Sequence, residues 1–355
     1  MMVDTGSGVF RHIRKVFFFV LKLTIAAAVV WFIAAQNFQG IKEGFASFRY
    51  IWLIPAAAIY FFHMVVCAFR WHRLIRVLDI RMSLFEAFVL SMQAYFFSLV
   101  IPGGAIGGDL VKIAMLNTRT PPGSKAEGAF SILMDRIVGM IAMFATAAVA
   151  VICSAPLLMR MEIAEWPLRP GMKIGGIVLV LLVCLGGIAA SLAVFCHRRF
   201  FPLPVIRQVV AWLDRRGRGI ATRLAAAADV YWRNPKVLFG SIFWSVLLVH
   251  LLLAVVFFCL LAGLGVTAVS GLTVVTAVML GNLAGLLPFS PGGIGIRDII
   301  VIAVLVAGGM AAGDAKTAQL LYTGLLIGFN LFGGVFFLIC PGRRRTVEIL
   351  RQAGE

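Results

Sequence analysis

Residues 84–117 read LFEAFVLSMQAYFFSLVIPGGAIGGDLVKIAMLN, an apolar stretch that a Pro-Gly-Gly run at 102–104 breaks near its middle. A second apolar stretch, 271–312, is broken in the same way by a Pro-Gly-Gly run at 291–293. Proline removes a helical hydrogen bond and glycine frees the backbone, so neither stretch is expected to form one continuous helix. Each stretch is predicted to form two helical arms joined by a non-helical elbow.

The composition around these stretches is that of a membrane protein. Of the 355 residues, 61% are apolar and 13% are charged, and the mean hydropathy is +1.00. Soluble domains are about 45–50% apolar and about 25% charged, and so few charges cannot cover the wet surface of a domain this size. Soluble enzymes, disordered chains and secreted disulfide scaffolds are therefore excluded, and the sequence predicts an all-α polytopic membrane protein.

Six further apolar runs are long enough to span a bilayer, which takes about 20 residues of helix. The first run has too long an apolar core for a signal peptide, and we expect it to stay in the protein as an uncleaved span. The chain is thus predicted to form a single transmembrane domain, 1–340, with a cytoplasmic tail, 341–355. The predicted spans are 16–35, 50–69, 130–151, 174–195, 237–262 and 318–340.

The basic residues predict an orientation. The chain holds 32 Lys and Arg against 15 Asp and Glu, a net charge of +17. With the N-terminus in the cytoplasm, 23 of the 32 basic residues fall in cytoplasmic segments and six in external ones. This asymmetry follows the positive-inside rule, so both termini are predicted to be cytoplasmic. The basic excess lies in short loops between apolar runs, which favours a membrane surface over nucleic acid as its partner.

The longest polar segment, 197–236, carries nine of the basic residues. Two interpretations are open for it: a segment that lies on the inner leaflet and binds anionic headgroups, or a solvated orientation signal. No catalytic or metal pattern accompanies it. The six cysteines show no CxxC spacing, and HExxH, P-loop and nucleophile-elbow motifs are absent from the sequence. The sequence therefore predicts no enzyme activity, metal or cofactor.

The two elbows reveal an internal repeat. Measured from Pro102 and Pro291, the preceding span starts 52 and 54 residues earlier, and the following span ends 49 residues later in both halves. Three crossings separate the two broken hairpins, so they are expected to open from opposite sides. The sequence thus predicts an inverted repeat, with repeat one at about 16–151 and repeat two at about 174–340, each holding a broken, re-entrant hairpin.

The expected depth of the two elbows differs. Residues 105–116 cover about 18 Å at 1.5 Å per residue, too little to cross a bilayer, so the first elbow is expected inside the membrane. The arms of the second stretch are expected to hold about 18 residues each. That length leaves open whether the second elbow lies inside the membrane or at its surface.

Charged residues follow both elbows, although ionisable groups inside apolar runs are costly and usually functional. One interpretation is mutual neutralisation that ties helices together. The other is that the cations contact a lipid phosphate, to which the planar donor fork of arginine is suited, while the carboxylates hold them in place. His63 and His250 occupy similar places in the two halves, and we expect a packing role for them rather than proton coupling. The charged sites are Asp109 with Lys112, Asp135 with Arg136, and Arg297 with Asp298.

Three motifs, in order, resemble the lysylphosphatidylglycerol synthase transmembrane-region family, also called flippase-like. They read PGGAIGGDLVK at 102–112, MDRIVG at 134–139 and PFSPGGIGIRD at 288–298. Lys112 stands where the family has arginine, and Asp298 where it has glutamate. The resemblance covers roughly 16–340 and implies a bacterial inner-membrane protein that moves or handles a lipid. The headgroup site that it implies comprises Gly107, Gly108, Asp109, Lys112, Asp135, Arg136, Gly293, Gly295, Arg297 and Asp298.

The resemblance and the repeat together lead to a functional expectation. The chain is expected to be a stand-alone family member without the synthase domain. As a lipid translocase, it would move a phospholipid or a lipid-linked headgroup across the inner membrane, bound near the two elbows. The alternative is a non-transporting lipid-binding or scaffold subunit for a separate lipid-modifying enzyme. In both cases the expected partners are membrane lipids, either anionic phospholipid or a lipid-linked substrate.

Overall fold

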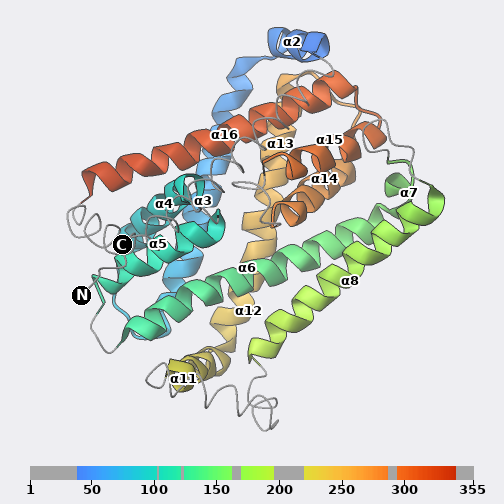
Figure 1. Cartoon of the computed structure of the whole chain (residues 1–355). Helices are drawn as coiled ribbons and strands as arrows, with labels where there is room; N and C mark the ends of the chain where they lie inside the picture. Colours follow the sequence, from blue (N-terminus) through green and yellow to red (C-terminus); the bar gives the residue numbers. More distant parts are fainter. Residues whose placement is uncertain are drawn as a thin grey trace, which may run out of the picture.

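The computed structural model describes residues 38–101, 104–120, 124–161, 169–195, 220–286 and 294–340 (Figure 1). The predicted first span 16–35, the tail 341–355, residues 197–219 of the basic loop and Gly293 lie outside these ranges. Within them the regular structure is helical, as predicted. The elements are α2 (Phe38–Ser47), η1 (Tyr50–Trp52), α3 (Leu53–Arg76), α4 (Leu84–Val100), α5 (Ala105–Asn117), α6 (Lys125–Cys153), α7 (Ala155–Leu158), α8 (Pro170–Phe195), α11 (Ile220–Arg233), α12 (Pro235–Trp244), η3 (Ser245–His250), α13 (Leu251–Gly263), α14 (Gly271–Ala284), α15 (Ile296–Ala307) and α16 (Ala312–Ile339).

Five helices in the described residues are long and apolar enough to cross a membrane, and each coincides with a predicted span. Several extend beyond the predicted bounds, because hydropathy marks only the apolar part of a helix that continues through polar residues. The span predicted to end at residue 69 continues to Arg76, which places Arg70 in the helix rather than in a loop. The five are Tyr50–Arg76, Lys125–Cys153, Pro170–Val194, Pro235–Gly263 and Ala312–Ile339.

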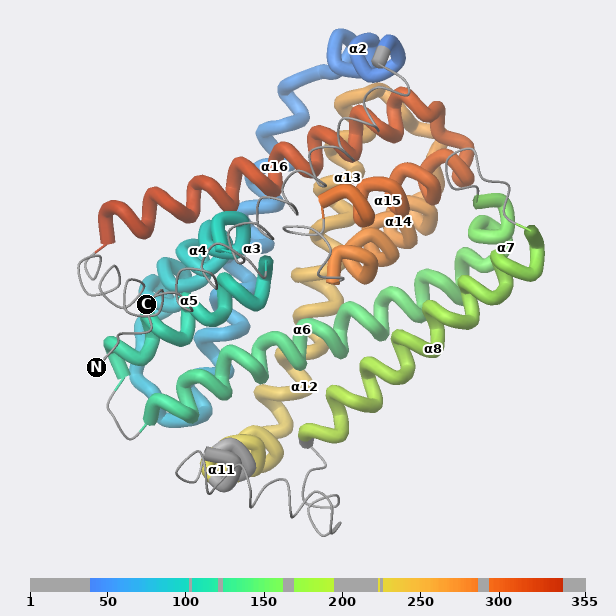
Figure 2. The backbone as a smooth tube through the Cα atoms, in the orientation of Figure 1, coloured from blue at the N-terminus to red at the C-terminus, as the bar shows by residue number. Residues whose placement is uncertain are grey.

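Each broken stretch forms two short helices that pack against one another, α4 with α5 and α14 with α15 (Figure 2). The first hairpin turns into α5 at Gly104, whose φ of 58° suits glycine. Helix α14 has 14 residues and α15 has 12, fewer than expected. The second hairpin is shorter because α15 stops before Gly308 and Gly309, the latter with φ of 91°. At 1.5 Å per residue these arms measure about 18–21 Å, short of the roughly 30 Å hydrocarbon core.

The helix contacts follow the same scheme in both halves. Helix α16, which closes the second half, packs along α4 of the first hairpin, and α6, which closes the first half, packs along α14 of the second (Figure 1). Helices α5 and α15 pack against their own closing helices, α6 and α16, while α3 and α13 pack against each other. Each half therefore supplies the helix that covers the hairpin of the other half.

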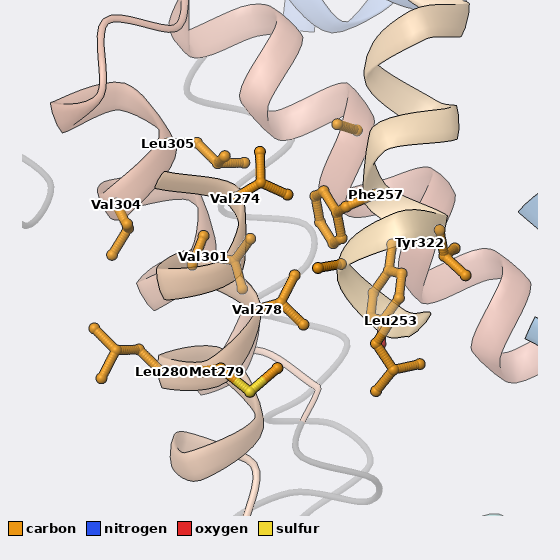
Figure 3. Close-up of a cluster of buried hydrophobic side chains, with 14 of the residues drawn as sticks. Leu253, Phe257, Val274, Val278, Met279, Leu280, Val301, Val304, Leu305 and Tyr322 are labelled. Carbon is orange, nitrogen blue, oxygen red and sulfur yellow. The ribbon is translucent and has the colours of Figure 1, made fainter. Parts of the chain in front are cut away.

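The largest buried cluster draws on most of the bundle, and part of it lies where α13, α14, α15 and α16 meet (Figure 3). Phe257, Val278, Val301 and Tyr322, one from each helix, are buried there. Lipid tails are as apolar as these side chains, so close van der Waals packing holds such helices together. Gly281 fits this packing, because a Cβ atom at that position would meet the side chain of Val301.

The described end of the basic segment is not a solvated loop. Residues 220–233 form helix α11, which packs against α6. Tyr231 is fully buried, and its hydroxyl donates a hydrogen bond of 2.9 Å to the Leu74 carbonyl at the end of α3. This end of the segment therefore belongs to the folded helix bundle.

Candidate functional site

Arg136 on α6 binds Asp109 on α5 through two of the three nitrogens of its guanidinium. Its Nε donates to Asp109 Oδ2 at 2.6 Å and its Nη2 donates to Oδ1 at 2.8 Å. The side chain of Arg136 is 44% exposed and that of Asp109 19%. We expected Arg136 to pair with its sequence neighbour Asp135, but consecutive residues of a helix point about 100° apart. The pair therefore forms between helices, on an open face.

Asp135 binds Arg70 on α3 instead. Arg70 Nε donates to Asp135 Oδ1 at 2.7 Å, and Nη2 donates to Oδ2 at 3.2 Å. The third guanidinium nitrogen, Nη1, donates to the hydroxyl of Ser245 at 3.0 Å. Only 11% of the Arg70 side chain and 14% of the Asp135 side chain are exposed. Sequence reasoning missed Arg70, because it placed this residue just beyond the end of a span.

Lys112 does not pair with Asp109, although the two residues are three apart on α5. Its ammonium donates to Ser91 Oγ at 3.1 Å and lies 3.6 Å from the centre of the Trp71 ring. The Lys112 side chain is buried between α5, α4 and α3. Trp71 in turn donates to Ser131 Oγ at 3.1 Å. Lys112 therefore ties three helices together, as one interpretation expected, but through Ser91 and Trp71 rather than by neutralising Asp109.

Arg297 and Asp298 open α15 and are both 3% exposed. The backbone N–H of Gly295 donates to Asp298 Oδ2 at 2.8 Å, which caps the helix. Asp298 Oδ1 accepts from Gln319 Nε2 and, at 2.9 Å, from Thr323 Oγ1, both on α16. The Arg297 guanidinium lies 3.3 Å from the same Oδ1. The predicted pair forms, and α16 completes it.

Gln319 and Thr323 were not predicted to belong to the site. They lie four residues apart on α16, so both face α15. Two polar residues at this spacing in an apolar helix are the sequence pattern that could have identified them. Arg297 Nη2 also donates to Thr323 Oγ1 at 2.9 Å. Gly295, at the start of this network, has φ of 100°. Because that backbone conformation is strained for other residues, a glycine is needed where the capped turn enters α15.

Side chains on one face of α3, together with Tyr322 of α16, lie between the Arg297–Asp298 pair and the Arg70–Asp135 pair. The Arg297 guanidinium lies 5.5 Å from the Tyr322 ring centre, and the Tyr322 and Tyr60 ring centres are 6.4 Å apart. Tyr60 contacts His63 with ring centres 5.7 Å apart, and His63 Nε2 lies 3.8 Å from Cys67 Sγ. These α3 residues and Arg70 follow at intervals of three or four, so they share a helix face.

The two histidines bind backbone carbonyls, as a packing role requires. The Nδ1 atom of His63 lies 3.0 Å from the carbonyl oxygen of Val249, and Nε2 of His250 lies 3.2 Å from that of Gly139. In each case the ring nitrogen donates, since a carbonyl oxygen only accepts. Both histidines therefore join α3, α6 and the π-helical segment η3 at the centre of the bundle.

Of the two predicted glycines of α5, Gly108 serves close packing. Gly107 and Gly108 are both buried. A Cβ atom on Gly108 would collide with the carbonyl oxygen of Ala94 on α4 and would crowd Ser98. Gly108 therefore allows the two arms of the first hairpin to approach with their backbones in contact. Gly293, the remaining predicted glycine, lies outside the described residues.

Taken together, the described part of the site holds paired charges and one cation bound to neutral groups. Breaking a buried pair leaves an uncompensated charge and costs several kcal/mol. The Arg136–Asp109 pair is more exposed than the Arg70–Asp135 and Arg297–Asp298 pairs, so separating its partners costs less. No group of three or more His, Cys, Asp and Glu residues suited to a metal is found among the described residues.

Comparison with known proteins agrees with this architecture. A model of the family "Lysylphosphatidylglycerol synthase TM region" matches residues 19–334. A protein named "UPF0104 membrane protein" from Methanothermobacter thermautotrophicus is 26% identical over 335 residues, covering 88% of this chain and 90% of the relative. The family match includes every described helix that carries a charged residue of the site. The chain is a membrane protein, and it belongs to the lysylphosphatidylglycerol synthase transmembrane-region family.

Proposed function

We propose that this protein is a lipid translocase that moves a phospholipid or lipid-linked headgroup across the plasma membrane. The proposal rests on the Arg136–Asp109 pair, which is partly exposed on the apolar helix bundle and is joined by two hydrogen bonds. Charges at membrane depth are rare and usually mark a ligand pathway. A lipid phosphate presents two oxygens to a guanidinium, as a carboxylate does. It can therefore replace Asp109 as the acceptor of the two hydrogen bonds that Arg136 donates.

The neighbouring pairs supply what such an exchange needs. Asp135, next to Arg136 in the sequence, keeps its charge balanced by Arg70 while Arg136 changes partner. Asp109, once released, is available to a cationic group of the headgroup. Arg136 is thus the proposed phosphate contact, and Asp109 is the proposed internal substitute for the lipid when the site is empty.

The helix arrangement supports an inverted repeat. The reciprocal contacts of α16 with α4 and of α6 with α14 are those expected when two copies of one unit face each other. Both hairpins have arms shorter than a bilayer, which favours elbows inside the membrane. Backbone without helical hydrogen bonds is tolerated there only inside protein or beside a wet cavity. With the positive-inside orientation, both termini are proposed to be cytoplasmic.

The Arg297–Asp298 network is the proposed counterpart of this site in the second half. It is buried and hydrogen-bonded to Gln319 and Thr323 of α16, whereas the Arg136–Asp109 pair is partly exposed. This asymmetry is expected for a transporter that exposes its two halves alternately, with one pair open while the other is closed. Opening the second pair would require Gln319 and Thr323 to separate from Asp298.

The test is lipid transfer by purified protein in liposomes. Fluorescent phosphatidylglycerol is the first probe, and its accessibility to an external reductant reports movement between leaflets. Wild type is expected to accelerate transfer, and Arg136→Gln is expected to lose most of it. Arg160→Gln, which changes an exposed arginine after α7, is the matched control and should transfer as wild type does.

A charge exchange separates a phosphate contact from a mere helix tie. The double variant Asp109→Arg, Arg136→Asp restores the ion pair with its sign reversed. If the pair only joins α5 to α6, this variant folds and transfers lipid. If Arg136 binds phosphate, the variant folds but does not transfer. Binding of lipid without any transfer by wild type would instead support the non-transporting lipid-binding subunit.

A further inference from the structure

A pocket whose lining does not include the Arg136–Asp109 pair opens between α3 and the segment formed by α12 and η3. Its volume is about 320 Å³, at the small end of the range for ligand pockets. It is therefore large enough for one end of a lipid rather than a whole molecule. Its exposed wall is almost entirely apolar, although two arginines and two serines are among the residues that form it. The lining residues are Phe62, Val65, Val66, Phe69, Arg70, Arg73, Leu84, Ser241, Trp244, Ser245, Leu248 and Val249.

An unsatisfied hydroxyl lies in this pocket. Ser241 is 3% exposed, and its Oγ has no hydrogen-bond partner. Leaving a buried hydroxyl unpaired is costly, and such groups usually have a ligand or another polar partner. The neighbouring Ser245 Oγ is already engaged, since it accepts from Arg70 and donates to the Ser241 carbonyl at 2.6 Å. Ser241 is thus a buried hydroxyl with unused hydrogen-bonding capacity at the pocket wall, and a ligand reaches it once the neighbouring side chains shift.

The charge in the pocket is positive. Arg70 is balanced by Asp135, but Arg73, one turn further along α3, has no ion-pair partner among the residues that the structure describes. A guanidinium and a hydroxyl donor beside apolar walls match a phosphate ester attached to a hydrocarbon chain. A free phosphate would use the donors but not the walls formed by Phe62, Val65 and Phe69.

The backbone of η3 explains why the pocket can form here. Residues Ser245–His250 form one π-helical stretch within the long helix Pro235–Gly263. Single π turns inside α-helices widen the helix locally and often occur at functional sites. Trp244 directly precedes the stretch, is half-exposed and lines the pocket. The widened turn therefore presents Ser245 and Val249 to the pocket from one side while α3 supplies the other.

We propose that this pocket binds an anionic phospholipid. Its phosphate accepts hydrogen bonds from Arg73 and Ser241, and one acyl chain lies along Phe62 and Phe69 of α3. Arg73 and Arg76 lie in the last turn of α3, the end that the positive-inside rule assigns to the cytoplasm. The lipid is therefore one of the cytoplasmic leaflet, where anionic headgroups and basic helix ends meet. This binding does not require the protein to transport lipid.

Trp244 provides the reporter for a test in phosphatidylcholine nanodiscs. Phosphatidylglycerol with brominated acyl chains quenches nearby tryptophan, and subtracting the signal of Trp244→Phe isolates the contribution of Trp244. We expect half-maximal quenching at a lower mole fraction of brominated phosphatidylglycerol than of brominated phosphatidylcholine. The expected preference is about fivefold, the effect of one basic residue near an anionic surface.

Arg73→Gln should abolish this preference, whereas Arg76→Gln, which removes an exposed charge one turn away and outside the pocket, should retain it. Ser241→Ala should reduce the preference while raising the melting temperature of lipid-free protein, because it removes an unpaired buried hydroxyl. Equal quenching by both lipids in wild type would overturn the proposal. So would an equal loss of preference in Arg73→Gln and Arg76→Gln.

Discussion

The carboxylates of Asp109 and Asp135 each bind an arginine through two hydrogen bonds, yet they lie in different surroundings. The Asp135–Arg70 pair is enclosed by α3, α6 and η3, while the Asp109–Arg136 pair is open on one side. Solvent screens an exposed charge. When a mutation removes one partner of an exposed pair, leaving the other charge unpaired therefore costs less free energy than it does in a buried pair. Burial, rather than the geometry of the hydrogen bonds, therefore sets how much each pair contributes to stability.

Asp135→Asn is accordingly expected to destabilise the protein by about 3 kcal/mol, because it leaves Arg70 buried without a countercharge. Asp109→Asn should cost about 1 kcal/mol or less. Thermal unfolding of the purified variants in one detergent measures the difference. The double variant Arg70→Met, Asp135→Leu, which removes both charges, should recover most of the stability. Equal losses in the two single variants would contradict this account of the charges.

At the scale of the elements, helix α4 is held by backbone contacts on two sides. Gly108 of α5 lies against the Ala94 carbonyl, and Gly333 of α16 lies against the Met92 carbonyl. Small residues let helices approach this closely in a membrane, where apolar side chains gain little by leaving lipid. The two glycines join α4 both to its own hairpin partner and to the closing helix of the other half.

Gly333→Ala should therefore push α16 away from α4 and cost about 1–3 kcal/mol, the usual range for overpacking. Gly328→Ala is the matched control on the same helix, because a Cβ atom at Gly328 would meet nothing within 4 Å. That control should be neutral or stabilising by up to about 1 kcal/mol, since alanine favours helix more than glycine. Melting temperatures of the two variants test this, and a loss of stability in both would contradict the predicted close contact.

The start of α4 predicts a pH dependence. Ser83 Oγ accepts from the Glu86 N–H at 3.1 Å, and Glu86 Oε2 accepts from the Ser83 N–H at 2.9 Å. The hydrogen bond from the Ser83 backbone lowers the pKa of Glu86 below its usual value of 4.5. The stability that this cap adds is therefore fully present above pH 4.5 and is lost as the pH falls through the lowered pKa.

Hydrogen exchange in the first turn of α4, corrected for intrinsic rates, should consequently increase as the pH drops below about 4.5. Glu86→Gln keeps a side-chain oxygen that can accept the same bond, because glutamine also serves in capping boxes. That variant should show the same protection at every pH in this range. If its protection falls with pH as wild type does, another group controls the end of the helix.

At the scale of the whole molecule, the order of helices was predictable, but of the three expected charge pairs only Arg297 with Asp298 forms as predicted. Hydropathy is a local property, so it located the five spans that fall in the described residues and the helices of both broken stretches. Asp135 finds its partner 65 residues away on α3, and only the folded bundle brings the two together. Gln319 and Thr323 likewise reach Asp298 from another helix. The second hairpin was predicted too long, because Gly308 and Gly309 were not recognised as the end of α15.

The two halves should have opposite orientations, and equivalent positions in them offer a direct test. Arg81 lies two residues before Ser83, the cap of α4, and Ala268 lies two residues before Ser270, the cap of α14. Both are exposed. In a variant without other cysteines, Ala268→Cys should react with a membrane-impermeant maleimide in intact cells, and Arg81→Cys only after permeabilisation. The positive-inside rule places Arg81 on the cytoplasmic side, and inversion places Ala268 opposite. Reaction of both from the same side would rule out the inverted repeat, and with it the alternating exposure of the Arg136–Asp109 and Arg297–Asp298 pairs.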